Sequence, residues 1–236
     1  MSTVKLFSGD DSSAWHARTW TDFARADAGK RLAILPLYGL TDWGLGRPLD
    51  AEEVVASAIL ERALKAVPEA IRPLALPPLR QLPAQHPSMT LTVDIETAHR
   101  SVFAIARSVQ ASGCHRLMLF NSNPFCEEWI DVSARDLRIE LGLQTFCINL
   151  SGLGLDFHSG RTPDSKVLQC ILTHLLQSTP DTAAVYPLDD PLVDLLLAVE
   201  GVSATAAEDA EDSLGRIGMR LSGLLQEILQ HPLLTQ

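Results

Sequence analysis

The stretch LPLYGLTDWGLGRPLDAEE, residues 35–53, leads from an apolar strand through a loop into the start of a helix. The apolar run RLAILPL (31–37) predicts a buried strand. Asp50 and Glu53 have the spacing of a capping box, which predicts a helix that starts at this point with Asp50 as its N-cap. The stretch therefore predicts a strand–loop–helix unit. Its loop, 38–50, follows an apolar strand, which is where α/β enzymes hold catalytic residues.

The same alternation of strands and helices continues along the chain. In the first helix, Val55, Ile59 and Ala63 share one face, and Glu52 and Lys65 are expected to be available for solvent. The proline-rich segment 68–87 predicts one short strand and an extended loop. Further strands are predicted at 89–93, 116–120 and 143–150, and further helices from Asp94 to Gly113 and over 129–141, 165–176 and 206–229. This order predicts one α/β domain over residues 1–236, a three-layer α/β/α fold with a mostly parallel central sheet.

Composition narrows the class of protein. A formal net charge of −10 and a pI near 5.1 argue against nucleic acid as a partner. The sequence has no apolar run of 18 residues and no secretory signal, so we expect a cytoplasmic protein that does not bind a membrane. The cysteines form no CxxC pair, which favours reduced thiols over a zinc site; they are Cys114, Cys126, Cys147 and Cys170.

Three loops follow predicted strands and are the candidate site: 38–50, 121–128 and 151–163. LPLYGLTDWGLGRPLDAE resembles the LPxGSxEQHGPHLPLGTD stretch of the creatininase (creatinine amidohydrolase) family. RLMLFNSNPFC resembles that family's strand ending in NGHGGN, with Asn121 matching. FHSGRTPDS resembles its HAGxxETS motif at His158, Gly160 and Ser165. The order and spacing of these blocks extend the resemblance over nearly the whole chain.

The resemblance implies a homo-oligomer, such as a hexamer, that binds two divalent metals and hydrolyses small amides. Here the matching ligand positions hold Thr41, Trp43, Glu52 and Asn123, and a further family carboxylate falls near Phe125 or Arg161. Only Glu52 is a carboxylate, whereas a divalent cation needs several His, Asp or Glu ligands. We therefore expect no catalytic metal and no other cofactor.

The remaining polar residues predict metal-independent chemistry. His158 matches the family's histidine and is a candidate general acid or base, or else a histidine that packs in the core. Asp42 could orient His158, act as a base or face water. A nucleophilic dyad of Cys126 and His158 is a further alternative.

Other residues in the three loops are candidates for substrate binding. Thr41 could hydrogen-bond a substrate, and Trp43 could stack on a ring or play a structural role. Arg161, and also Arg47, could bind a carboxylate unless they face solvent. Asn121 and Asn123 could hold a carbonyl or an oxyanion, or could stabilise their own turn. Glu52 completes the predicted substrate-binding set.

Together these features predict an enzyme that acts on a small polar, possibly carboxylate-bearing substrate in a biosynthetic pathway. Proton transfer by His158 could support cyclisation, elimination or amide chemistry. One alternative is a non-catalytic scaffold subunit that keeps the fold for assembly. Another is a metal-dependent amidohydrolase with an altered site.

Overall fold

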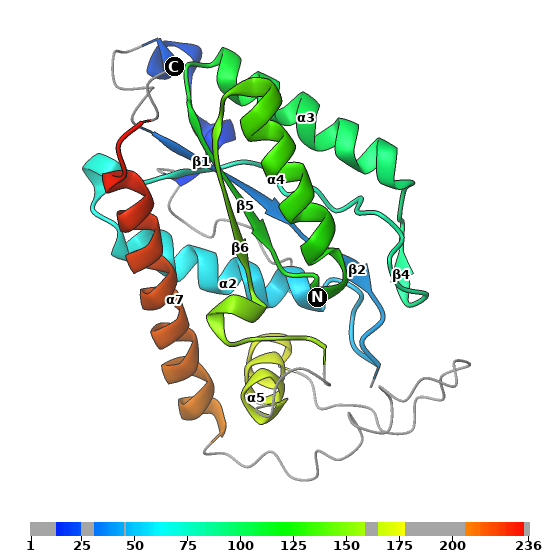
Figure 1. The fold of residues 1–236 in the computed structure, drawn as a ribbon. Coiled ribbons are helices and arrows are strands. Elements are labelled where there is room, and N and C mark those ends of the chain that lie inside the picture. Colours follow the sequence, from blue (N-terminus) through cyan, green and yellow to red (C-terminus); the bar gives the residue numbers. More distant parts are fainter. Residues whose placement is uncertain (1–12, 25–30, 45, 159–164, 178–205, 234–236) are drawn as a thin grey trace.

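The centre of the molecule is a sheet of four parallel strands in the order β3-β1-β5-β6 (Figure 1). The computed structural model describes residues 13–24, 31–44, 46–158, 165–177 and 206–233. The strands are β1 (Leu32–Leu37), β3 (Leu74–Ala75), β5 (Arg116–Asn121) and β6 (Gln144–Asn149). A separate antiparallel pair joins β2 (Leu40–Thr41) to β4 (Met89–Thr90).

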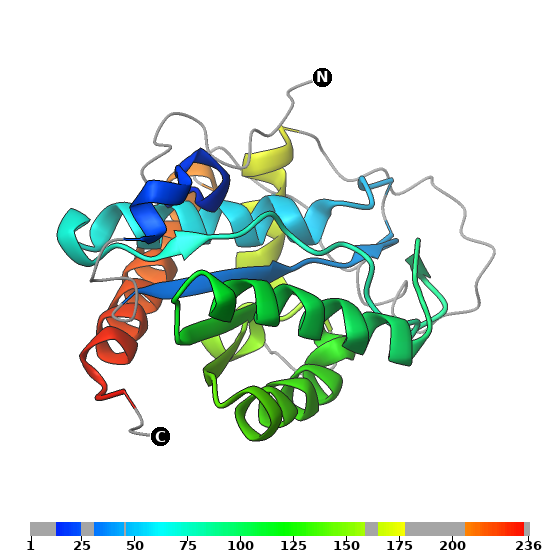
Figure 2. The same cartoon turned by 90° about the horizontal axis from the view of Figure 1, so that it is seen from above.

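Helices cover both faces of the sheet, as the view from above shows (Figure 2). One face carries α2 (Ala51–Ala66), α5 (Ser165–Leu176) and α7 (Ala206–Gln230), and the other carries α3 (Ile95–Ala111) and α4 (Glu127–Leu141). The short elements are α1 (Trp20–Phe23), η2 (Trp15–Ala17), η4 (Glu69–Ile71), η5 (Pro124–Cys126) and η6 (Ser151–Leu153). The predicted three-layer α/β/α fold with a parallel sheet is confirmed.

Alternate residues of β1 serve two separate hydrophobic cores. Leu32 and Ile34 pack in the core with α2, α5 and α7, whereas Ala33 and Leu35 pack in the core with α3 and α4. Every residue of the strand is therefore buried. A strand covered on both faces needs a continuous apolar run rather than an alternating one, and this is why the run at 31–37 identified it.

The predicted capping box at the start of α2 is wrong. The side chain of Asp50 makes no capping hydrogen bond. Glu53 instead accepts two hydrogen bonds from the Arg80 guanidinium, from Nε and Nη2, each at 2.6 Å. A bidentate, charge-assisted pair is stronger than a bond to a backbone N–H, so the long-range partner wins.

The expectation that Glu52 is available for solvent is also wrong, because its side chain is fully buried. The first turn of α2 lies against the end of the sheet, so this residue points into the protein. The predicted strand at 89–93 is shorter than expected. It ends at Thr90, and Leu91 follows with a φ of 49°.

The other predicted boundaries agree with the structure within a few residues. The Asp94 side chain caps α3 by accepting a hydrogen bond from Thr97 N at 2.8 Å. Gly142 ends α4 with a φ of 63°. None of the described helices is long and apolar enough to cross a membrane.

Candidate functional site

The candidate loops meet where the parallel strands end. Leu37 of β1 is in register with Asn121 of β5, which is in register with Asn149 of β6. The loops after these strands therefore start side by side, at the lower end of the sheet in Figure 1. The first turn of α2 brings Glu52 to the same place.

The Glu52 carboxylate is the centre of a buried hydrogen-bond network. Two donors reach Oε1, and two more reach Oε2. The four bonds are Trp43 Nε1 to Oε1 at 2.9 Å, Asn123 Nδ2 to Oε1 at 2.9 Å, Gly39 N to Oε2 at 3.1 Å and Ser122 Oγ to Oε2 at 3.0 Å. Asn123 Nδ2 also lies 3.1 Å from Thr41 Oγ1. We call Gly39, Thr41, Trp43, Glu52, Ser122 and Asn123 the Glu52 network.

The network is closely packed and shielded from water. Thr41, Glu52 and Asn123 have no exposed surface. A Cβ atom at Gly39 would lie 2.5 Å from Asn123 Nδ2 and 3.0 Å from each carboxylate oxygen, so only glycine fits there. Burial raises the pKa of Glu52, and the hydrogen bonds from its neighbours oppose this shift.

Asn121 and Asn123 also hold their own turn together. The Asn121 amide donates to the Asn123 carbonyl at 2.8 Å and to Asn149 Oδ1 at 3.0 Å, and its oxygen accepts from Asn123 N at 3.0 Å. Asn123 Oδ1 accepts from Phe125 N at 3.0 Å and so caps η5. These bonds match the alternative in which both residues stabilise their turn.

Aromatic side chains cover the outer side of the network. The Trp43 ring stacks on Phe125 with a centroid separation of 5.7 Å, and it packs against Phe157 at 5.1 Å. Phe125 in turn stacks on His86 at 4.2 Å and meets His158 edge-on at 5.7 Å. His86 and His158 are both half-buried, so two imidazoles border this cluster of rings.

The hydrogen bonds of His86 fix its tautomer. Its Nδ1 accepts from Ser88 N at 3.2 Å and lies 2.7 Å from Ser88 Oγ. An acceptor at Nδ1 places the proton of the neutral ring on Nε2. At His158 it is the backbone N–H that is held, and it donates to Asp156 Oδ1 at 2.8 Å.

Asp42 is directed at its own loop rather than at His158. Its Oδ1 accepts from Gly44 N at 2.9 Å, and its backbone N–H donates to the Ser88 carbonyl at 3.0 Å. Within the described part of the chain, Asp42 and His158 share no hydrogen bond or ion pair. The described residues therefore show no direct bond through which Asp42 would orient His158.

The two loop arginines and Cys126 complete the predicted set. Arg47 donates to Gln169 Oε1 on α5, and burial lowers its pKa to about 10. Arg161 lies outside the described residues. Burial and the nearby Glu52 charge raise the pKa of Cys126 to about 12, so this thiol is protonated near neutral pH and is a poor nucleophile.

Comparison with known proteins identifies the fold and the family. The family model described as creatinine amidohydrolase matches residues 16–188. The chain belongs to the creatininase family. A search of the curated proteins finds no match.

Three solved structures illustrate the likeness. A mutant creatininase complexed with creatine is 19% identical, with a TM-score of 0.62 over 93% of this chain and 99% of that one. A mutant creatininase of the Zn–Zn type is also 19% identical, with a TM-score of 0.62 over 94% and 100% of the two chains. A putative creatinine amidohydrolase from Bacteroides fragilis is 16% identical, with a TM-score of 0.62 over 86% and 92%.

The residues at the positions that the sequence resemblance assigns to metal ligands do not fit a metal pair. Thr41, Trp43, Glu52 and Asn123 do converge, but they contribute one carboxylate, one hydroxyl, one amide and one indole. The N–H groups of Trp43 and Asn123 point at the carboxylate, where a cation would have to bind. Among the described residues, no cluster of three or more His, Cys, Asp or Glu side chains could hold a metal ion.

Sequence reasoning found most of this network but missed some members. It identified Thr41, Trp43, Glu52 and Asn123 through the motif positions, but not their direct contacts with one another. It missed Gly39 and Ser122 of the network, and also His86 beside Phe125. The Asn-Ser-Asn-Pro turn gave a signal for Ser122, whereas His86 lies in a proline-rich loop with no motif that marks it.

Proposed function

We propose that this creatininase-family protein works without a dinuclear metal centre, as a non-hydrolytic subunit whose fold serves binding and assembly. The observation that carries the proposal is the convergence of four donors on the Glu52 carboxylate. A metal ligand must offer lone pairs to a cation. In this protein N–H and O–H groups already occupy those lone pairs.

The same network explains why a metal-bound water is not expected beside Glu52. Metal-dependent amide hydrolysis needs a cation that lowers the pKa of a bound water and polarises the carbonyl. The Glu52 network contains a single negative charge, and its neutral donors compensate that charge. It therefore acts as a structural link between α2, the loop after β1 and the turn after β5.

An activity assay with a matched variant tests this proposal. The purified protein is supplied with zinc or manganese and incubated with creatinine and with small linear and cyclic amides. We expect no turnover above the protein-free rate. Metal-dependent turnover that is lost in Glu52→Gln but kept in Glu128→Gln, which changes an exposed carboxylate on α4, would overturn the proposal.

Exposed apolar side chains support the assembly part of the proposal. Ile95 on α3 and Val132 on α4 are 52% and 55% exposed, and both line a shallow cavity of about 410 Å³. Apolar surface of this kind is common where proteins associate. Light scattering after gel filtration should give a homo-oligomer that Val132→Asp dissociates. A monomer at high protein concentration would refute this part.

Metal-free proton transfer is a second candidate function, favoured by the two imidazoles beside Phe125. His158 and His86 are both half-buried next to this ring, His158 in a candidate loop and His86 in the proline-rich segment. A positioned imidazole can donate or accept a proton near neutral pH. The substrate class would be a small polar molecule, with a carboxylate as one option.

A screen for binding, followed by a test for conversion, distinguishes the non-hydrolytic subunit from the metal-free enzyme. A panel of small carboxylates and cyclic amides is screened for binding by the change in melting temperature, and each compound that binds is then tested for conversion. Conversion that His158→Gln abolishes while binding remains would establish the enzyme. Binding without conversion in the wild type would support the non-hydrolytic subunit.

A further inference from the structure

The outer face of α4 exposes hydrophobic side chains to solvent. Val132 and Ile139 are 55% and 69% exposed, and they lie about two turns apart on the same side of the helix. Ile95 of α3 is 52% exposed, and it lines the shallow cavity of about 410 Å³ together with Val132 and Trp129. Exposed apolar surface that is grouped in this way is typical of a contact with another protein.

Charged residues of opposite sign divide the same face into two halves. Asp131 is exposed in the first half of α4, and Arg135 and Arg138 are exposed in the second half. Residues three or four positions apart share one side of a helix, so these side chains stand in a row next to Val132 and Ile139. The face is therefore negative toward the start of the helix and positive toward its end.

The acidic residues in the second half of α4 point elsewhere. Asp136 is turned toward α3, where its Oδ2 lies 3.9 Å from His99 Nε2. Glu140 follows Asp131 by about two and a half turns, so it lies on the opposite side of the helix. Neither carboxylate shares the outer face with the two arginines.

This order of charges makes the face complementary to itself. When a second copy of α4 lies antiparallel to the first, the basic half of each helix meets the acidic half of the other. A twofold axis repeats every contact, so Asp131 beside Arg135 of the second copy also puts Arg135 beside Asp131 of that copy. A parallel arrangement would bring like charges together. The face therefore selects both a second copy and its direction.

The same register adds apolar contacts to the ion pairs. With Asp131 opposite Arg135, Ile139 of the second copy is level with the first turn of α4, next to the cavity that Trp129 and Val132 line. Exposed ion pairs contribute little to affinity. The apolar side chains therefore supply most of the stability of the pair, and the charges select the partner and its orientation.

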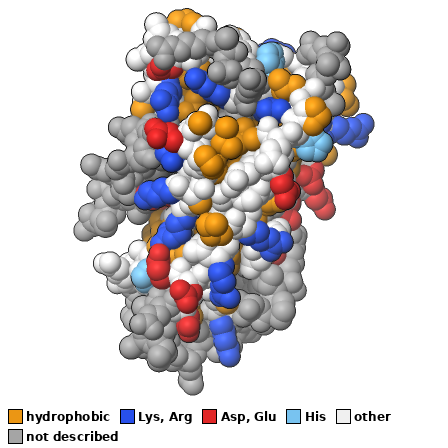
Figure 3. Space-filling view, turned by 90° about the vertical axis from the view of Figure 1, so that its left-hand side faces the viewer, with side chains coloured by type: hydrophobic (Ala, Val, Ile, Leu, Met, Phe, Trp, Pro, Cys, Tyr) orange, Lys and Arg blue, Asp and Glu red, His pale blue; other side chains and the backbone are white. Residues whose placement is uncertain are grey.

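On the side of α7, by contrast, several charges are paired within one copy. Figure 3 faces this side and shows Lys and Arg side chains among acidic and hydrophobic ones. Arg62 of α2 lies 2.7 Å from Glu211 of α7, and His174 of α5 lies 3.4 Å from the same carboxylate group. These contacts join helices of a single copy, so they do not select a second one.

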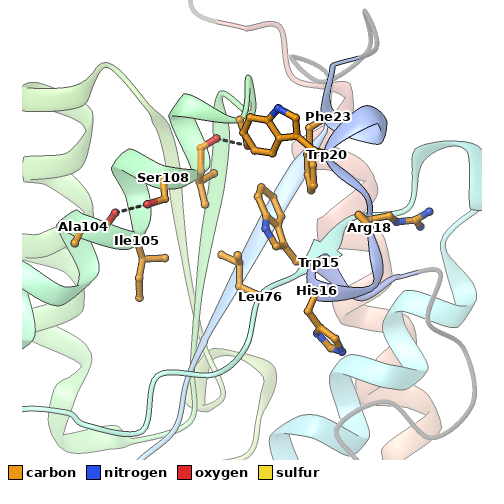
Figure 4. A pocket seen from close by; sticks show the side chains of 11 residues that line it. Trp15, His16, Arg18, Trp20, Phe23, Leu76, Ala104, Ile105 and Ser108 are labelled. Atoms are coloured by element: carbon orange, nitrogen blue, oxygen red, sulfur yellow. Dashed lines mark hydrogen bonds between the residues drawn. The ribbon is translucent and has the colours of Figure 1, made fainter.

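The second half of α3 is bordered by another segment of the same chain. Figure 4 shows Trp15, Trp20 and Phe23 near Ile105, around a cavity of about 560 Å³. Ile95 is at the other end of α3 and lies beside α4. A second copy packed on α4 therefore leaves these aromatic side chains in place.

We propose that two copies of this chain associate through the outer face of α4, with the two helices antiparallel about a twofold axis and Asp131 of each copy beside Arg135 of the other. This pairing rests on the assembly part of the proposed function, and it assigns the exposed apolar surface to a contact between identical chains. Acidic residues near the start of a helix and basic residues near its end also stabilise the helix itself. The experiment therefore has to separate the two effects.

Charge reversal in the full-length protein tests the pairing. Asp131→Arg and Arg135→Asp each bring like charges together in a pair of identical copies, and each should weaken self-association by roughly tenfold or more at low ionic strength. Mixed in equal amounts, the two variants carry complementary charges and should associate with each other as the wild type does with itself. Light scattering after gel filtration gives the mass, and an affinity tag on one variant shows whether it retains the other.

Two further variants complete the design. Asp131→Arg combined with Arg135→Asp in one chain restores opposite charges between identical copies and should regain the mass of the wild type. Glu140→Arg is the matched control, because it reverses an exposed carboxylate on the opposite side of α4 and should leave the mass unchanged.

The outcomes separate this pairing from the assembly proposed above. If the mixture of single variants and the double variant both stay dissociated, the two charges serve only the helix itself and the pairing is overturned. Single reversals that keep the mass of an oligomeric wild type would also overturn the pairing, whereas the homo-oligomer would stand through another face. A monomeric wild type would overturn both.

Discussion

Glu52 is the residue that links the separate parts of the candidate site. Its carboxylate is fully buried and accepts from the loop after β1 and from the turn after β5. A buried charge is costly unless hydrogen bonds compensate it. Each donor should therefore contribute measurably to stability, and the N–H of Trp43 can be removed while an aromatic ring is kept.

Trp43→Phe tests that contribution. The change keeps an aromatic ring beside Phe125 but removes the N–H that donates to Glu52. We expect the free energy of unfolding to fall by roughly 1–3 kcal/mol more than packing alone explains. Urea unfolding of the variant and of the wild type measures this difference.

Trp129→Phe is the matched control, because its indole Nε1 is buried and makes no hydrogen bond to any described residue. The two tryptophans are 6% and 7% exposed, so the loss of ring surface is similar. Equal destabilisation by the two changes would mean that the hydrogen bond to Glu52 contributes nothing.

The dependence of stability on pH tests the electrostatics of Glu52. Because burial raises its pKa, the folded protein binds this proton more tightly than the unfolded chain does. The resulting stabilisation is complete below the ordinary carboxyl pKa and is lost as the pH rises through the pKa of the folded state. The wild type should therefore lose stability relative to Glu52→Gln as the pH rises over this range.

Thermal or urea unfolding of both proteins at a series of pH values measures the effect. The comparison cancels the titration of groups that the two proteins share. If the wild type instead gains stability relative to Glu52→Gln with rising pH, the donors outweigh burial and the pKa of Glu52 is lowered.

At the scale of elements, α2 positions Glu52, and α7 positions α2. Gly218 of α7 lies directly over α2, where an added Cβ would be 2.8 Å from Arg62 Cβ. Arg62 also forms an ion pair with Glu211 of α7 at 2.7 Å. Close approach of the two helices therefore depends on a residue without a side chain.

Three glycine substitutions in α7 separate packing from helix propensity. Gly218→Ala should destabilise the protein by about 1–3 kcal/mol, because the helices must move apart. Gly215→Ala and Gly223→Ala have no atom within 4 Å of the added Cβ and should each stabilise the protein by up to about 1 kcal/mol. Melting temperatures measure all three, and a stabilising Gly218→Ala would contradict the close packing of α2 and α7.

Elements governed by local sequence were predicted well from the sequence. The strand at 31–37 follows from an apolar run. The start of α3 follows from Asp94, which lies three residues before the N–H that its side chain caps. The capping box at Asp50 and Glu53 failed because the partner of Glu53 is Arg80, far along the chain. A long-range ion pair leaves no signal in local spacing.

At the scale of the whole molecule, the sheet brings together residues that the sequence keeps far apart. The order of strands and helices predicted which loops would meet, because the carboxyl ends of parallel strands share one edge. It did not predict that the polar groups of these loops would bond to one another, since that depends on side-chain directions.

Zinc binding at Glu52 is the most direct test of the central claim, that a hydrogen-bond network replaces the family's metal centre. Crystals soaked in zinc are measured at the zinc absorption edge. We predict no anomalous peak within about 2.3 Å of the Glu52 carboxylate oxygens, with Trp43 and Asn123 still donating to them. A peak at that position, with these donors displaced, would contradict the account.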